Sequence, residues 1–277
     1  MGKESSVLII ILNYKTYQLT LNLIEQLKKL NYPSFDILVI DNNSSNESGK
    51  ILKEKANILN YIFIQNSKNT GYAAGNNIGL KYAIVNNYDY SLIANNDLKI
   101  LDNNFLEVLV NVAENNSHIA CVGPKVIDIN NNIVPPYINK PTKRSMTIGL
   151  RHEKKIRANH EETSGIVYRI FGCCMLLNNK YMNLVNYMDE RTFLYCEEEI
   201  LAERLLKYNL YSYYCADTSI MHMESMSVGK NKGLKNLNKI KIQWYSMDIY
   251  LREYLKLNRC TAFMCKLIRA IVSFIRG

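Results

Sequence analysis

The chain has 277 residues, of which 48% are hydrophobic and 21% charged, with a formal net charge of +9. This composition is typical of a globular protein, and the length fits one large α/β domain or one domain with an appendage. No run of about 18 apolar residues occurs, which excludes a membrane-spanning helix, and the N-terminal residues do not form a signal peptide.

Strands and helices are expected to alternate over the first hundred residues. Short, continuous apolar runs predict strands at 6–12, 35–41, 60–65 and 89–94. Apolar residues at helical spacing predict a helix at 16–30. We also expect a short helix at 46–56 and a helix at 71–87 that begins with a turn of small residues. Because continuous apolar strands are buried on both faces, this order predicts a mostly parallel, doubly wound sheet with right-handed crossovers.

Beyond residue 97 the pattern is less regular. We expect helices at 103–115 and 197–208, strands at 119–128, 166–177 and 211–215, and helix from about 233 to the end. The segment 135–165 contains three prolines, several charges and little apolar periodicity. We interpret it as a mobile loop over the site, as long functional loops often are.

The excess positive charge is confined to the C-terminal end. Residues 230–277 hold 11 Lys and Arg against 2 Asp and Glu, so residues 1–229 are neutral overall. Within this tail, residues 260–277 would be amphipathic as a helix. Helical spacing places Phe263, Leu267, Ile271 and Ile275 on one face. Such a helix favours docking on an anionic membrane surface. The alternatives are packing on the rest of the chain or on a second copy, as a homodimer.

Two further classes of partner or site are not expected. The basic tail would also suit nucleic acid, but basic and aromatic residues are not interleaved on a strand platform, so we expect no nucleic-acid partner. The seven cysteines include no CxxC pair, which indicates a reducing compartment and no structural zinc. We therefore expect a cytoplasmic protein, peripheral on the inner face of the plasma membrane.

Three of the predicted strands end in polar clusters, namely Asn13-Tyr14, Asp41-Asn42-Asn43 and Asn95-Asn96-Asp97. Ligands of open α/β sheets bind beyond the carboxyl ends of the strands, so these clusters predict one shared site. Asp41 could accept hydrogen bonds from a nucleoside, or equally cap a helix. Asp97 could hold Mg²⁺ or Mn²⁺ with substrate phosphates completing the shell, or form an Asx turn.

Three other features carry a functional and a structural interpretation. The small residues from Asn69 to Gly79 open a helix whose free N–H groups favour diphosphate, or they allow close packing on the sheet. The carboxylates of Glu197, Glu198 and Glu199 supply a general base, or merely suit the helix N-terminus. His222 is an additional metal ligand or a structural histidine.

In this order the segments resemble family 2 glycosyltransferases, inverting enzymes of the GT-A fold, and most closely the bacterial rhamnosyltransferase-like branch. The resemblance covers roughly residues 5–228 and rests on segments 9–14, 39–45, 69–79, 95–97, 172–176 and 193–198, and on His222. It implies a GT-A domain at 1–228, which has a Rossmann-like, mostly parallel central sheet flanked by helices. A basic amphipathic helical extension would follow at 229–277.

The resemblance also implies a role for each motif. The nucleotide sugar would be bound by Asn13, Tyr14, Asp41, Asn42, Gly71, Asn76, Asn77, Asn96 and Asp97. Gly172 and Cys173 would line the acceptor side, and Asp97 and His222 would hold Mn²⁺ or Mg²⁺. Glu198 would be the catalytic base, preceded by Glu197. The family often has Asp at the position of Glu198 and a second acidic residue at that of Ile200, so the base could instead be Glu197 or Glu199.

The implied reaction moves a sugar, rhamnose being the branch's commonest, from a nucleoside-diphosphate sugar to a hydroxyl group. The acceptor would be a glycan or a lipid-linked glycan of bacterial surface polysaccharide synthesis, such as capsule or O-antigen. One alternative is a nucleotidyltransferase, although no Gly-rich, Lys- or Arg-bearing phosphate signature lies near the first strand. Another is a catalytically inactive sugar-nucleotide-binding homologue, suggested by Ile200.

Overall fold

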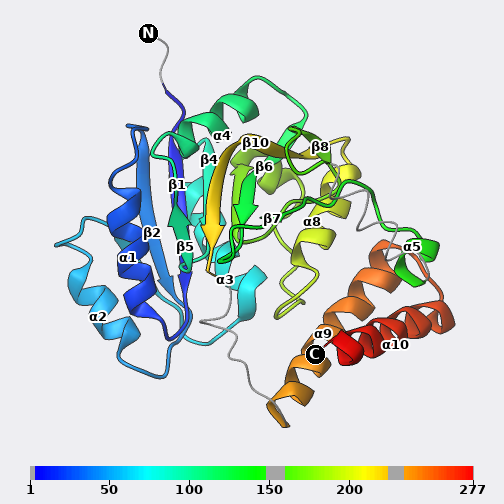
Figure 1. Ribbon diagram of the computed structural model, residues 1–277. Coiled ribbons are helices and arrows are strands. Elements are labelled where there is room, and N and C mark those ends of the chain that lie inside the picture. Colours follow the sequence, from blue (N-terminus) through cyan, green and yellow to red (C-terminus); the bar gives the residue numbers. More distant parts are fainter. Residues whose placement is uncertain (1–3, 148–159, 224–233, 277) are drawn as a thin grey trace.

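A central mixed sheet flanked by helices forms the body of the molecule (Figure 1). The computed structural model describes residues 4–147, 160–223 and 234–276. The strands are β1 (Val7–Asn13), β2 (Phe35–Asp41), β3 (Ile62–Gln65), β4 (Tyr90–Ala94), β5 (Leu98–Ile100), β6 (Ile119–Ile127), β7 (Ile133–Val134), β8 (Gly165–Val167), β9 (Cys174–Asn178) and β10 (Tyr211–His222). Their order is β3-β2-β1-β4-β9-β6-β10-β5, with β7 beside β6 and β8 beside β10.

The helices follow the alternation expected over the first hundred residues and become shorter and less regular afterwards. They are α1 (Tyr17–Leu27), α2 (Ser48–Lys55), α3 (Gly71–Val85), α4 (Phe105–Glu114), α5 (Lys143–Thr147), α7 (Asn179–Leu184), α8 (Glu197–Leu206), α9 (Leu234–Ile249), the π-helical turn η1 (Tyr250–Tyr254) and α10 (Arg259–Arg276). None of the described helices is both long and apolar enough to cross a membrane.

The first four strands are parallel, as the apolar runs predict. β1 pairs in parallel with β2 and β4, and β2 pairs with β3. The register places Asn13 opposite Asp41. The polar ends of these strands therefore meet at one edge of the sheet, which confirms the expected gathering of the first two clusters.

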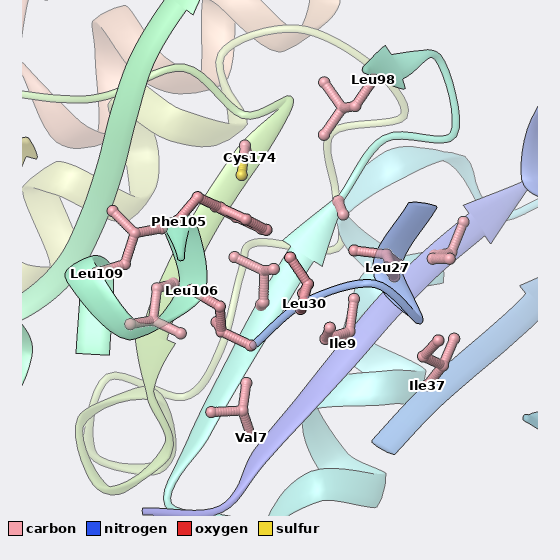
Figure 2. Packing of buried hydrophobic residues seen from close by; sticks show 14 of the residues in the cluster. Val7, Ile9, Leu27, Leu30, Ile37, Leu98, Phe105, Leu106, Leu109 and Cys174 are labelled. Carbon is pink, nitrogen blue, oxygen red and sulfur yellow. The ribbon is translucent and has the colours of Figure 1, made fainter. Parts of the chain in front are cut away.

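β1 is buried on both faces because helices cover both. Val7, Ile9 and Ile11 belong to the core beneath α1 and α4, and Figure 2 shows part of that packing. Leu8 and Ile10 belong to the opposite core, which α3 covers. Each fully buried side chain of this size contributes about 1.5–3 kcal/mol. The strands that carry the polar clusters are thus held firmly on both sides.

The second half of the sheet departs from the expectations. The run 166–177 is two strands, β8 and β9, and β9 lies antiparallel between β4 and β6. β10 does not stop at residue 215 but continues to His222, with an irregularity between Cys215 and Ser219 in its pairing with β6. The polar residues Asp217, Thr218 and Ser219 interrupt the apolar pattern there, which hides the second part of the strand in the sequence.

The C-terminal helices pack on the rest of the molecule at the lower right of Figure 1. Their small core contains Met146, Ile200, Met247, Ile249, Tyr250, Leu251, Ala262 and Cys265. Part of the loop expected at 135–165 is therefore ordered, since α5 supplies Met146 to this core, while residues 148–159 lie outside the described residues. The predicted domain boundary at 228/229 also lies outside them. All seven cysteines are free thiols.

Candidate active site

A buried polar network joins the ends of β1 and β2. Asn13 Nδ2 donates to Asp41 Oδ1 at 2.7 Å, and Asn13 Oδ1 accepts from the hydroxyl of Thr20 at 2.9 Å. Asn96 joins the same network, because its Nδ2 donates to the hydroxyl groups of Thr16 at 2.8 Å and Thr20 at 3.0 Å. The network fixes the strand ends relative to α1, and Asn96 points into it.

Asp41 is fully buried and its carboxylate is already occupied. Besides Asn13, it accepts from the backbone N–H and the hydroxyl of Ser44, at 2.9 and 2.6 Å, and from Gln65 Nε2 at 2.8 Å. In the structure this carboxylate shapes the loop after β2 and does not cap α2, whose N-cap is Glu47. Its expected contact with a nucleoside would require one of these donors to move.

The exposed aromatic ring at this edge is that of Tyr14. Its side chain is 41% exposed, and the Lys15 ammonium lies 4.9 Å from the ring centroid. An aromatic face with a neighbouring cation suits a nucleotide, since it offers a surface for the base and a charge for phosphate. Tyr14 therefore presents an exposed ring at this edge, and its contact with a nucleotide stays a prediction.

Asn42 ties the loop after β2 to the start of α3. Its Nδ2 donates to Asn69 Oδ1 at 3.0 Å and to the Gly71 carbonyl at 3.2 Å, and its Oδ1 accepts from Asn66 Nδ2 at 2.9 Å. The helix start that was expected to face diphosphate is thus positioned by the second polar cluster.

Gly71 is required by the backbone. Its φ is +83°, and an added Cβ would lie 2.2 Å from the Phe193 carbonyl oxygen. The Tyr72 N–H donates to that same oxygen at 2.8 Å. Since this N–H bonds to protein, the start of α3 is docked against the loop that precedes α8. Gly71 thereby allows the start of α3 to lie against the segment that leads to the glutamates.

The two asparagines of α3 make different contacts from those expected. Asn77 donates to the Met188 carbonyl at 2.9 Å and to Glu190 Oε1 at 3.0 Å, and it accepts from the Met188 N–H at 3.1 Å. Asn77 therefore tethers residues 188–190, and its expected contact with ribose or diphosphate stays a prediction. Asn76 is fully buried, and its Oδ1 has no hydrogen-bond partner among the described residues.

Asp97 and His222 lie side by side, although 125 positions separate them in the sequence. The His222 Nε2 is 3.2 Å from Asp97 Oδ1, and the antiparallel pairing of β10 with β5 brings the two segments together. Asp97 is 4% exposed, and its carbonyl accepts from the Met223 N–H at 3.0 Å. The pair places one carboxylate and one imidazole at the same edge of the sheet.

This pair suits a divalent cation that substrate phosphates also bind. No group of three or more His, Cys, Asp and Glu side chains gathers to hold a metal within the described part of the chain. Mg²⁺ and Mn²⁺ commonly take only one or two protein ligands in nucleotide enzymes and complete their shell with phosphate oxygen and water. The donor set therefore fits a metal bound together with a diphosphate.

The Glu198 carboxylate packs directly on Gly172. The Gly172 N–H donates to Glu198 Oε1 at 3.0 Å, and a Cβ on Gly172 would lie 2.7 Å from that oxygen. The Tyr72 hydroxyl donates to the Gly172 carbonyl, and the next residue, Cys173, accepts from the Asn95 N–H at 2.8 Å. Residues 172–173 thus connect the start of α3, the end of β4 and the start of α8.

The three glutamates have distinct environments. Glu197 is 3% exposed and its Oε1 has no hydrogen-bond partner among the described residues. Burial, with repulsion between neighbouring carboxylates, raises the pKa of both Glu197 and Glu198. The Arg169 guanidinium acts against this rise in the pKa of Glu198. Glu199 pairs with Arg169, at 3.0 Å between Oε1 and Nε.

Arg169 is a site residue that the sequence analysis did not single out. It is 8% exposed, and its guanidinium carbon lies 3.6 Å from the centroid of the Tyr137 ring. A single arginine in a strand-like run gives no local signal of this role. Only the pairing with Glu199 and the stacking on Tyr137 reveal it.

Strained backbone leads into the glutamates. Tyr195 and Cys196 have φ values of 77° and 66°, a left-handed conformation that costs non-glycine residues about 1–2 kcal/mol each. The Ser246 hydroxyl of α9 donates to the Leu194 carbonyl at 2.8 Å, just before this turn. The C-terminal helices therefore help to hold the turn that presents Glu198.

Comparisons with known proteins bear on the whole arrangement. The family model described as Glycosyl transferase family 2 matches residues 6–184. No curated protein sequence matches the chain.

Several solved structures resemble this one. TarS of S. aureus has 15% sequence identity and a TM-score of 0.58, over 89% of this chain and 40% of that chain. The mannosyltransferase PcManGT from Pyrobaculum calidifontis, in complex with GDP-Man and Mn²⁺, has 11% identity and a TM-score of 0.61, over 90% and 65%. GalNAc-T7 with UDP, GalNAc and Mn²⁺ has 14% identity and a TM-score of 0.63, over 90% and 50%. At these identities the likeness shows the fold, which is GT-A, and the chain spans between 40% and 65% of these longer chains.

Proposed function

Because the chain belongs to glycosyl transferase family 2, we propose that it transfers a sugar from a nucleoside-diphosphate sugar to an acceptor hydroxyl with inversion. The observation that carries this proposal is the connection made by residues 172–173. These residues contact Glu198 on one side and the β4 end that leads to Asp97 on the other. A base and a carboxylate that would hold a diphosphate-bound cation, both at one edge of the sheet, suit a displacement between them.

Glu198 acts as the base in this proposal. The acceptor oxygen forms a bond to the anomeric carbon as the bond to the leaving diphosphate breaks, and the hydroxyl proton passes to the Glu198 carboxylate. The Gly172 N–H holds Oε1, so Oε2 is the oxygen that takes the proton. A positioned base of this kind contributes about 10²–10⁴-fold. Glu197 is less suitable because its side chain is 3% exposed, whereas that of Glu198 is partly exposed.

Asp97 and His222 would hold Mn²⁺ or Mg²⁺ together with the diphosphate. When bound, the cation neutralises the negative charge that develops on the leaving diphosphate. The Mn²⁺ in the complexes of PcManGT and GalNAc-T7 supports this assignment. The same edge carries Tyr14 and Lys15. We assign the Tyr14 ring to the nucleobase of the donor and the Lys15 ammonium to its phosphate.

The first candidate donor and the candidate acceptor follow from the resemblance. Rhamnose from a dTDP donor is the first candidate sugar. The acceptor would be a glycan or lipid-linked glycan used in bacterial surface polysaccharide synthesis, reached from the cytoplasmic face of the plasma membrane. The GDP-Man and UDP-GlcNAc complexes of similar structures make mannose and N-acetylglucosamine donors the next candidates.

A thermal-shift screen tests the proposal. Nucleoside diphosphates and sugar nucleotides are added with and without Mn²⁺, and the donor that stabilises the protein is then assayed for release of its nucleoside diphosphate. A stabilising donor that is turned over supports the proposal. Binding without turnover would favour an inactive homologue, and release of inorganic pyrophosphate from a nucleoside triphosphate would favour a nucleotidyltransferase.

A further inference from the structure

Among the side chains of α10 that the structure describes, residues 259–269, three large apolar ones are exposed and four small or polar ones are buried. The exposed residues are Phe263 (54%), Met264 (56%) and Leu267 (43%). The buried positions hold Thr261, Ala262, Cys265 and Lys266. A helix that merely packs on its own protein turns its large apolar residues inward. The outward face of α10 therefore suits an apolar environment outside the chain.

The neighbouring helix α9 enlarges this apolar surface. The rings of Trp244 and Phe263 are 6.0 Å apart in an edge-on arrangement. Tyr245 is 59% exposed and Ile240 41% exposed. Both of these residues line a shallow groove of about 490 Å³ with Trp244. We call Ile240, Trp244, Tyr245, Phe263, Met264 and Leu267 the docking face. Tryptophan and tyrosine are the aromatic residues enriched at membrane–water boundaries.

The charge around the docking face favours a lipid surface over a second copy of the chain as its binding partner. The last 48 residues carry a net charge of +9, and both of their acidic residues are paired, Asp248 with Lys266 and Arg252, and Glu253 with Arg191. Lys239 and Lys241 beside the docking face are exposed. A second copy would bring two basic surfaces together, which is unfavourable, whereas anionic lipid headgroups complement them.

We infer that the docking face binds an anionic lipid bilayer, with α10 lying along the interface and not crossing it. Phe263, Met264 and Leu267 enter the boundary between headgroups and acyl chains, and the lysines of α9 contact the headgroups. The Ser246–Leu194 hydrogen bond joins α9 to the turn before Glu198.

Flotation of the full chain with lipid vesicles tests the inference independently of catalysis. Vesicles of phosphatidylcholine mixed with phosphatidylglycerol are expected to carry the protein upward, and vesicles of phosphatidylcholine alone are not. The double variant Phe263→Ser/Leu267→Ser should bind the anionic vesicles at least about tenfold more weakly. Lys239→Gln and Lys241→Gln should each weaken binding about fivefold at low salt.

Ile58→Ser is the matched control, because Ile58 is 77% exposed and lies beyond α2, outside the docking face. It should bind the vesicles as the unchanged chain does. The substituted positions on α10 are exposed, so the double variant should keep its thermal unfolding temperature. Failure of the unchanged chain to float with anionic vesicles would overturn the inference, as would unaltered flotation of the double variant. Light scattering that shows a dimer, lost in the same double variant, would also overturn it and assign the face to a second copy.

Discussion

Replacing Gly172 by alanine tests the placement of the proposed base. The new Cβ would lie 2.7 Å from Glu198 Oε1, whereas ordinary contacts begin at 3.4 Å, so the carboxylate must withdraw by about 0.7 Å. A displacement near 1 Å in a catalytic group can cost about 10²-fold in rate. We therefore expect Gly172→Ala to lower kcat about 10- to 100-fold, which corresponds to about 1.4–2.7 kcal/mol of transition-state stabilisation. The KM for the donor should change little, because the proposed base acts on the acceptor hydroxyl and not on the donor.

The assay is steady-state release of nucleoside diphosphate from the donor found in the thermal-shift screen. Gly165→Ala is the matched control, since a Cβ there meets no atom within 4 Å. Both variants should unfold at nearly the same temperature as the unchanged chain. A folded Gly172→Ala variant with the kcat of the Gly165→Ala control would refute Glu198 as the base.

Three further outcomes follow from the structure. Arg169→Met should move the rise of kcat with pH to higher pH, because the Arg169 charge favours the ionised form of Glu198 while burial raises its pKa; a pH profile that does not move would contradict this link. Gly71→Ala should lower the free energy of unfolding in urea by about 2 kcal/mol or more, since it adds left-handed strain and a clash with Phe193, and an unchanged midpoint would contradict the close approach. Asn77→Ala should cost about 1–3 kcal/mol of stability without weakening nucleotide binding; calorimetry that shows weaker nucleotide binding at full stability would restore the role expected from the sequence.

The parallel half of the fold could be predicted because its signals are local. Each of the strands ending at Asn13, Asp41 and Ala94 is a continuous apolar run followed by a polar residue. The antiparallel half of the sheet could not be predicted, because each of its strands pairs with strands far away in the sequence. Nothing near β9 in the sequence indicates that it inserts between β4 and β6.

The candidate site divides in the same way. The placement of Asp97 with His222 and of Glu198 with Gly172 in one site was expected only through the family resemblance. The residues themselves did not indicate it, because the end of β10 that carries His222 could not be recognised in the sequence. The hydrogen-bond partners of a buried amide or carboxylate could not be predicted from the sequence, because they depend on the donors that tertiary packing supplies. Asn77 therefore bonds to a loop 111 positions away, and the oxygens of Asp41 bond to Asn13, Ser44 and Gln65.

The central claim is that Asp97 and Glu198 serve opposite sides of one reaction at the same edge of the sheet. Calorimetric titration of the nucleoside diphosphate, with and without Mn²⁺, tests it on Asp97→Asn, Glu198→Gln and the control Asp36→Asn, an exposed residue at the far end of β2. We expect Mn²⁺ to tighten binding to the control and to Glu198→Gln alike, and to have no effect on Asp97→Asn. Mn²⁺-dependent binding that survives in Asp97→Asn, or is lost in Glu198→Gln, would contradict this division of roles.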